Sequence, residues 1–204
     1  MAKIQKVDYE KIPKNAQQMR AHGKELNTEL TNAYQSVKDM HKDWYGKRYN
    51  ALVKQFNKLT SQINDMLKIV VTDVPYALET IANNYSQADQ GKNATSAKQE
   101  SIKKITNIEE STDVGMRFVS SSVTSTQSKV SKNFKSATEK MDTIEGEFKK
   151  ISWESEAATA FQSKFNKLKK EIVTSFNDIE KSFTKLMNET KDDIEKAEKS
   201  NTVN

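Results

Sequence analysis

The residue types that usually carry catalysis are few in this chain and poorly placed for it. The two histidines, His22 and His41, lie far apart, and there is no cysteine. Thiol catalysis, disulfides and thiolate metal sites are therefore excluded, and no histidine spacing suits a metal. Acidic pairs such as Asp192-Asp193 lie among lysines, and neither a glycine-rich phosphate loop nor a Ser-His-Asp grouping is evident. The sequence predicts no enzymatic activity, no cofactor and no metal.

Two short motifs are suited to recognition instead. Trp44 and Gly46 form a Trp-Tyr-Gly triplet, in which the glycine can adopt positive φ and the tryptophan offers a large apolar face. Tyr85 and Asp89 are four residues apart, so they share one helix face. The tyrosine ring supplies contact area at small entropy cost, and the carboxylate supplies one directed charge. Taken singly, each motif also fits a structural role, as a capped turn or as a half-buried tyrosine beside a solvated acid.

The first half of the sequence predicts two amphipathic helices around the Trp-Tyr-Gly triplet. Apolar residues recur at steps of three and four, which is the helical period. The first stripe is Leu26, Leu30, Ala33, Val37, Met40 and Trp44, and the second is Leu52, Phe56, Leu59, Ile63, Leu67, Val70, Val74, Ala77, Ile81 and Tyr85. Pro75 lies inside the second helix, where it removes a hydrogen bond, so a kink is expected there.

The second half repeats this plan. Its stripes are Val123, Val130, Ala137, Met141, Ile144, Phe148 and Ile151, then Phe161, Phe165, Leu168, Ile172, Phe176, Ile179, Phe183, Leu186 and Ile194. The halves match at a constant offset of 109 residues, without a gap from Trp44 to Asp89. Trp44 then falls on Trp153, and the chain has only two tryptophans. We interpret this match as an internal duplication.

These patterns predict three segments and one fold class. Residues 1–89 form a first helical hairpin, 90–112 a polar linker that could be partly helical around Ile102, Ile105 and Ile108, and 113–204 a second hairpin with a frayed tail. One hairpin alone leaves its apolar stripe exposed to water, whereas two can cover each other. We therefore expect an all-α protein in which the two long hairpins pack antiparallel as an elongated four-helix bundle, a single-chain pseudo-dimer.

The composition excludes several classes of protein. Five glycines and two prolines are too few for a β-rich fold. The net charge of +5 is spread thinly among interleaved acids, so no nucleic-acid partner is expected. The N-terminus lacks the apolar run of a signal peptide, and the most apolar stretch, MLKIVVTDV, is too short to span a membrane. We expect no cleaved signal peptide and no stable membrane insertion.

The combination of these features resembles the WXG family, the roughly hundred-residue substrates of type VII (ESX/Ess) secretion. Trp44 and Gly46 match its W-x-G turn, and Tyr85 and Asp89 match its Y-x-x-x-D/E motif. The second half matches less fully. Ser155 stands where W-x-G has glycine, a substitution that the family admits, and Glu198 supplies the acid while Ile194 replaces the tyrosine.

The resemblance implies a secreted, non-enzymatic protein that crosses the membrane through an ATPase-driven translocase. Family hairpins pair antiparallel, with W-x-G of one near Y-x-x-x-D/E of the other. In this chain Trp153 would then lie near Tyr85 and Asp89, and Trp44 near Ile194 and Glu198. The first pairing alone has its tyrosine, which marks it as the export end. The implied protein is cytoplasmic before export, extracellular afterwards, monomeric, and either a secreted effector or a carrier of a co-secreted effector.

Two other functions fit the sequence. A membrane-active bundle, like pore-forming toxins that store amphipathic helices, finds support in the apolar stretch 66–74. An intracellular scaffold, or a nucleic-acid binder using the positive charge, would show steep salt dependence. Liposome leakage and salt-dependent DNA binding separate these alternatives from an exported protein.

Overall fold

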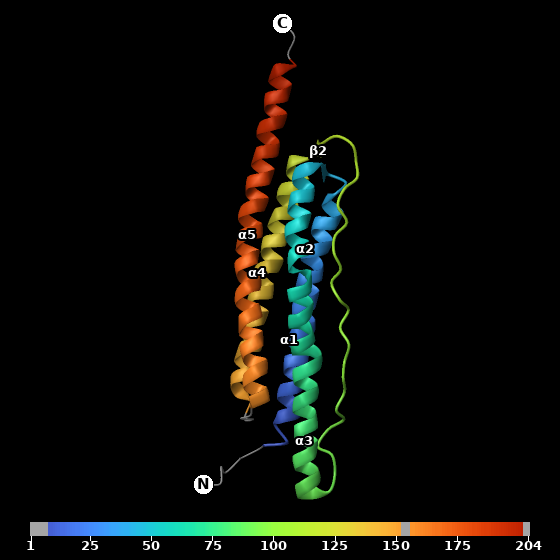
Figure 1. Ribbon diagram of the computed structural model, residues 1–204, viewed down its shortest axis with the longest axis vertical. Helices are drawn as coiled ribbons and strands as arrows, with labels where there is room; N and C mark the ends of the chain where they lie inside the picture. The colour runs from blue at the N-terminus through green and yellow to red at the C-terminus, as the bar shows by residue number, and fades with distance from the viewer. Residues whose placement is uncertain (1–7, 152–155, 202–204) are drawn as a thin grey trace. The chain divides into compact units, whose positions relative to one another are not determined.

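The computed structural model describes residues 8–151 and 156–201, with the side chains of 156–158 left out. The elements in chain order are α1 (Ile12–Met40), β1 (Trp44–Tyr45), α2 (Lys47–Leu67), the π-helix η1 (Lys68–Asp73), α3 (Val74–Gln90), β2 (Arg117–Phe118), α4 (Ser120–Lys150) and α5 (Glu156–Ser200) (Figure 1). Of the described residues, 78% are helical, with α1 packed against α4 and α2 against α5. The predicted all-α helical bundle is confirmed.

The chain divides into two compact units, and each draws on both halves of the sequence. The first, called here the α3 unit, comprises Met1–Thr28, Gln62–Lys104 and Ala137–Glu171. The second, called the turn unit, comprises Glu29–Ser61, Ile105–Ser136 and Ile172–Asn204. The division by sequence into 1–89, 90–112 and 113–204 stays a prediction.

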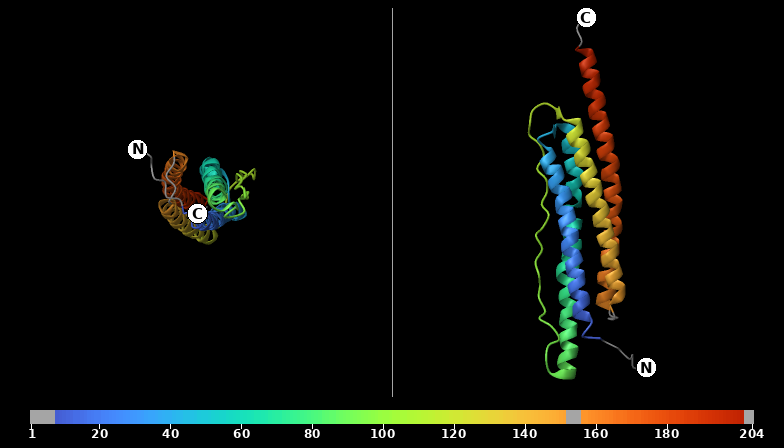
Figure 2. Two further views of the ribbon diagram at one scale, coloured as in Figure 1. Left: turned by 90° about the horizontal axis from the view of Figure 1, so that it is seen from below. Right: turned by 180° about the vertical axis from the view of Figure 1, so that it is seen from behind.

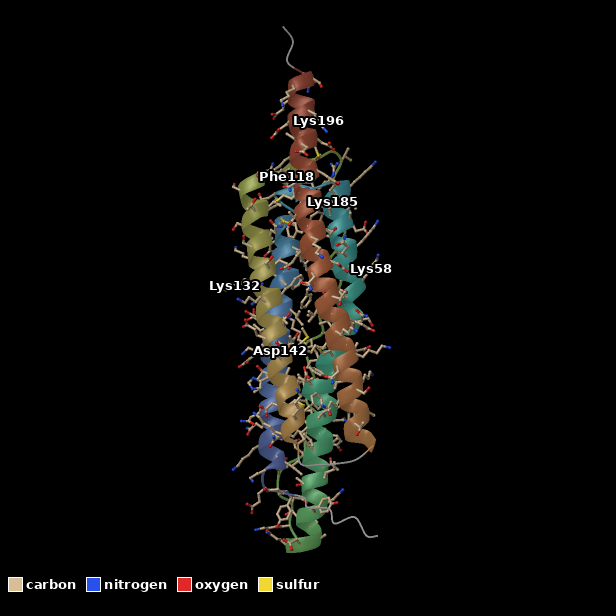
Figure 3. All side chains as sticks on the ribbon, turned by 90° about the vertical axis from the view of Figure 1, so that its left-hand side faces the viewer. Lys58, Phe118, Lys132, Asp142, Lys185 and Lys196 are labelled. Carbon is tan, nitrogen blue, oxygen red and sulfur yellow. The ribbon has the colours of Figure 1, made fainter. Side chains whose placement is uncertain are left out.

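Aromatic side chains fill the core of the turn unit. Phe134 of α4 stacks on Phe176 of α5 with ring centroids 4.0 Å apart, and Phe56 of α2 lies 5.7 Å from Phe134. The edge of Tyr34 on α1 meets Phe56 at 5.2 Å. All four helices of this unit thus contribute to one aromatic cluster, while charged residues such as Lys58, Lys132 and Lys185 lie on the outer faces (Figure 3).

The same register of buried residues occurs in both halves. Seven buried residues of the first half are matched, 109 positions later, by seven buried residues of α5. The first set is Phe56, Leu59, Ile63, Leu67, Val70, Val74 and Leu78, and the second is Phe165, Leu168, Ile172, Phe176, Ile179, Phe183 and Met187. In the α3 unit the matched residues Gln62 and Glu171 also meet each other, with Nε2 donating to Oε2 at 3.1 Å. Contact between equivalent residues is typical of a twofold relation.

A π-helical segment precedes Pro75. Because proline has no backbone N–H, the carbonyl of Val71 loses the donor that an α-helix would provide. Arg20 of α1 replaces it, with Nε donating to Val71 O at 3.3 Å. The matching position in the second half is Thr184, and α5 runs through it as continuous α-helix. The chemistry of proline therefore accounts for this difference between the halves.

The segment 91–116, called here the strap, is extended and runs beside α3 and α2 (Figure 1). The partial helix suggested by the spacing of Ile102, Ile105 and Ile108 is absent. Ile105 and Ile108 are nevertheless 6% and 5% exposed. Side chains of the first hairpin bond to the strap backbone at several positions, which gives the strap the hydrogen bonds that a helix would otherwise supply.

Tyr34 predicts a loss of stability at alkaline pH. Its hydroxyl donates to Phe56 O at 2.6 Å, and burial raises its pKa from 10.0 to about 12, an effect that a hydrogen bond to Thr60 partly offsets. The unfolded chain therefore releases this proton first, and Tyr34 should cost up to about 2–3 kcal/mol of stability as pH rises from 10 to 12. Urea unfolding at pH 9, 10 and 11 checks this.

The matched variants for the alkaline experiment are Tyr34→Phe and Tyr76→Phe. Tyr76 is 38% exposed on α3. Tyr34→Phe should reduce the loss of stability above pH 10 to the part due to Tyr49, whose pKa burial also raises to about 12, and Tyr76→Phe should leave the loss unchanged. Equal slopes for both variants would show that the buried phenol does not govern alkaline unfolding.

Candidate functional site

The Trp-Tyr-Gly triplet forms the turn between α1 and α2. Trp44 and Tyr45 make up β1, and Gly46 follows with φ of 111°. A Cβ on Gly46 would lie 3.2 Å from Gly115 O, so both its conformation and its surroundings favour glycine. The sequence therefore fixes a tight turn just before α2 begins at Lys47.

Trp44 is the apolar anchor of this turn and is 1% exposed. Its ring stacks on Phe183 of α5, with centroids 5.8 Å apart and planes at 22°. Phe118 of β2 and Tyr49 of α2 meet it edge-on, at 5.7 Å and 6.3 Å. The tryptophan therefore joins the first hairpin to both the start and the end of the second.

A short strand pairing closes this turn, and the sequence pattern does not predict it. β1 and β2 are antiparallel, with Trp44 opposite Phe118 and Tyr45 opposite Arg117. The backbone N–H of Val119 donates to Asp43 O at 2.8 Å, and the Ser122 hydroxyl donates to the Asp43 carboxylate. Strands of two residues carry no detectable alternation, so only their contacts reveal them.

A cavity of about 260 Å³ lies beside the Trp-Tyr-Gly turn. Its lining residues are Trp44, Tyr45, Gly46, Lys47, Arg48, Gly115, Met116 and Thr190. Two apolar side chains of the adjoining loop are exposed, Val114 at 98% and Met116 at 50%. The C-terminal end of α5 extends past β1 and β2 in both side views (Figures 1 and 2). This end of the turn unit thus combines a buried tryptophan with an exposed apolar loop.

Arg48 supplies the electrostatic link from the turn to α5. Its Nη2 donates to Asp193 at 2.6 Å and its Nε to Glu189 at 3.4 Å. The hydrogen bond to Asp193 raises the pKa of Arg48. The pair orients the α5 segment that leads to Glu198, which is itself exposed.

The second motif lies at the end of α3 in the α3 unit. Tyr85 is 38% exposed, and Asp89 is exposed on the same helical face. Tyr9 donates its hydroxyl to Asp89 Oδ2 at 2.5 Å, and this bond raises the pKa of Tyr9. Gly91, with φ of 67°, ends the helix, and its N–H donates to Gln87 O at 3.0 Å. The motif is therefore held on a well-capped helix end and remains accessible.

The structure places the predicted residues in three groups. Trp44 and Gly46 lie in the turn unit, and Tyr85 and Asp89 in the α3 unit. Trp153 and Ser155 lie outside the described residues, so their proximity to Tyr85 and Asp89 stays a prediction. Trp44 meets α5 at Phe183, with Thr190 beside it in the cavity, and its pairing with Ile194 and Glu198 also stays a prediction.

The described residues show neither a metal-binding cluster nor a membrane-spanning helix. Over residues 8–151 and 156–201, no group of three or more His, Asp or Glu side chains is arranged to hold a metal ion. Within the same described ranges, no helix has the length and apolar character needed to cross a membrane. His41 Nε2 lies 2.8 Å from Oδ2 of Asp113, near the end of the strap.

Comparison with known proteins gives one family match. Residues 5–90 match the family model WXG100, described as proteins of 100 residues with WXG. The matched range includes Trp44, Gly46, Tyr85 and Asp89. No curated protein and no solved structure matches the chain.

Proposed function

We propose that this chain is exported folded by a type VII secretion system, because residues 5–90 match the model of the WXG100 family, whose members are substrates of such systems. In this proposal the chain is a non-enzymatic carrier for a polypeptide that is secreted together with it. The translocase ATPase is the partner that reads its export signal. A role as a secreted effector is the second candidate, and the exposed loop residues Val114 and Met116 favour it as a contact surface.

The observation that carries this proposal is the accessibility of Tyr85 and Asp89 on a folded, capped helix end. A translocase that accepts a folded bundle must find its signal on the surface. A half-exposed tyrosine beside a carboxylate supplies both contact area and a directed charge. The buried Trp44 serves a different purpose, because at 1% exposure it holds hairpins together.

We assign the second half to a second WXG-like hairpin. The shared offset of seven buried residues supports this assignment, as does the contact between Gln62 and Glu171. One chain would then supply the two hairpins that family members bring together from two subunits. Trp153 and Ser155 would complete the export signal near Tyr85. Glu198 would belong to a second, weaker end that lacks the tyrosine.

The test compares two tyrosines on the same helix. Tyr85→Ala should lower the secreted amount about tenfold, the loss typical of removing an aromatic anchor from a recognition surface. Tyr76→Ala is the matched control, because both tyrosines lie on α3 and both are 38% exposed. Immunoblots of culture supernatant and cell lysate give the secreted fraction of each variant.

Both variants must first be shown to fold, by helical circular dichroism and urea unfolding. If folded Tyr85→Ala and Tyr76→Ala are secreted equally, Tyr85 is not part of an export signal. If only Tyr85→Ala accumulates in the lysate, the motif is the signal.

A further inference from the structure

We propose that the face of α2 that carries Asn50 and Asn57, called here the track, binds extended polypeptide. The strap occupies the track in this structure, and an extended segment of a co-exported partner binds there when it displaces the strap. This inference deepens the carrier role and rests on it. The partner segment is defined by chemistry: an extended backbone carrying two aliphatic side chains three positions apart.

Two asparagines of α2 form hydrogen bonds with the backbone of the strap. The Asn57 amide donates to Ile108 O at 2.9 Å and accepts the N–H of Ile108 at 2.8 Å. The Asn50 amide does the same with Ser111, at 2.9 Å and 2.8 Å. Each side chain thus makes the paired bonds of a β-ladder, and such bonds recognise an extended main chain whatever its sequence.

The distance between these asparagines along α2 matches the length of three residues of an extended chain. Asn50 and Asn57 are seven residues apart, which is two helical turns and about 10.5 Å along the helix. Ile108 and Ser111 are three residues apart, or about 10 Å when extended. A helix face with asparagine at every second turn can therefore hold successive third residues of a strand.

Side-chain selection on the track is limited to a few positions. Ile105 and Ile108 are buried at 6% and 5% exposure, while Thr106 and Asn107 between them are exposed. Lys54 lies 3.3 Å from Glu110 at the rim. These contacts of α2 therefore favour a segment with two aliphatic residues three apart, followed by an acid.

Within the α3 unit, side chains of the helices also form hydrogen bonds with the strap backbone. Glu79 accepts the N–H of Lys98 at 2.9 Å, and Arg20 donates to the carbonyl of Lys98 at 3.0 Å. Thr72 donates to Glu100 O at 2.5 Å. These bonds go to the strap backbone, and Arg20 and Lys24 also pair with the side chain of Glu100, at 3.5 Å and 2.5 Å.

The strap ends in an exposed loop that leads to β2. Val114 in that loop is 98% exposed, so the loop leaves this end of the strap room to separate from α2. An incoming segment must compete with the tethered strap, whose effective concentration is high. We therefore expect a separate peptide to bind the protein more tightly when substitutions weaken the contacts between the strap and α2.

The experiment uses the full-length chain and a fluorescein-labelled peptide of residues 101–113. The strap is weakened in the protein by Ile105→Asp with Ile108→Asp, and in a milder form by Ser111→Pro, which removes the N–H donated to Asn50. Fluorescence anisotropy should show the peptide binding at least about tenfold more tightly to either folded weakened form than to the wild type. The milder form keeps the test available if the double variant does not fold.

Matched substitutions identify the track. Adding Asn57→Ala to a weakened form should reduce peptide binding about tenfold, given two lost hydrogen bonds, whereas adding Asn32→Ala, an exposed asparagine on α1, should not. A peptide with aspartate in place of Ile105 and Ile108 should not bind. Binding that is equally weak in all folded forms, or indifferent to Asn57, would overturn the track. This result would leave the Tyr85 export test unaffected, so the two proposals can fail separately.

Discussion

Replacing Arg20 with alanine is expected to lower the free energy of unfolding by about 3–5 kcal/mol, the usual cost of leaving one partner of a buried ion pair unpaired. Arg20 and Glu79 are 7% and 5% exposed, and their shortest contact, Nη1 to Oε1, is 2.7 Å. The same guanidinium also donates to Val71 O and Lys98 O. The substitution therefore removes a charge partner and the donors of two carbonyls at once.

Urea unfolding followed by helical circular dichroism measures this effect. The matched control is Lys24→Ala, one turn further along α1. Lys24 also pairs with a glutamate, Glu100 at 2.5 Å, but its side chain is 57% exposed. An exposed pair contributes about 0–1 kcal/mol. If the two substitutions cost the same, burial of the Arg20 pair does not stabilise the fold as described.

Replacing Trp44 with alanine should cost about 3–5 kcal/mol, since it removes a fully buried aromatic side chain and leaves a cavity. The loss should exceed that of an ordinary core residue because Trp44 joins α5, β2 and α2 through its stacking on Phe183 and its edge contacts with Phe118 and Tyr49. The turn itself should persist, because Gly46 is retained.

The control for Trp44 is its neighbour in β1. Tyr45 is only partly buried, so Tyr45→Ala should cost far less, while Trp44→Phe should recover part of the loss through a smaller ring. Thermal and urea unfolding of the three variants should rank them in that order. A Trp44→Ala variant as stable as the wild type would contradict the role of this tryptophan in holding the hairpins together.

The sequence predicted the helices well because amphipathic helices are encoded locally. The stripe from Leu26 to Trp44 is buried throughout, and so are the residues from Leu52 to Val74 in the second stripe. Beyond Val74 the buried positions shift by one residue, to Leu78, Ala82 and Ser86, while Tyr85 is 38% exposed. The π-helical segment changes the number of residues per turn, so a period of three and four continued through it predicts the wrong face of α3.

The strap could not be predicted, because its conformation depends on residues far away in the chain. Isoleucines at 102, 105 and 108 have a spacing that a short helix or an extended chain can satisfy. Asn50 and Asn57 favour the extended conformation, because their amides form hydrogen bonds with the backbone of Ser111 and Ile108. The π-helical segment before Pro75 likewise depends on Arg20, 51 residues from the carbonyl that it serves.

The candidate site was predicted in part. The Trp-Tyr-Gly turn and the helix-end position of Tyr85 and Asp89 follow from local pattern, and the family match covers both. The β1–β2 pairing, the hydrogen bond from Tyr9 to Asp89 and the cavity beside Gly46 arise from chain segments that meet only after folding. No spacing in the sequence encodes such contacts.

The most direct test of the central claim is the dependence of export on the type VII ATPase. The wild-type chain should be found in the culture supernatant of a bacterium that carries the system, and should be confined to the lysate when the ATPase gene is deleted. A cytoplasmic marker protein controls for lysis, and restoring the ATPase gene should restore secretion. Wild-type protein that reaches the supernatant equally with and without the ATPase, or stays in the lysate in both strains, would contradict the proposed function.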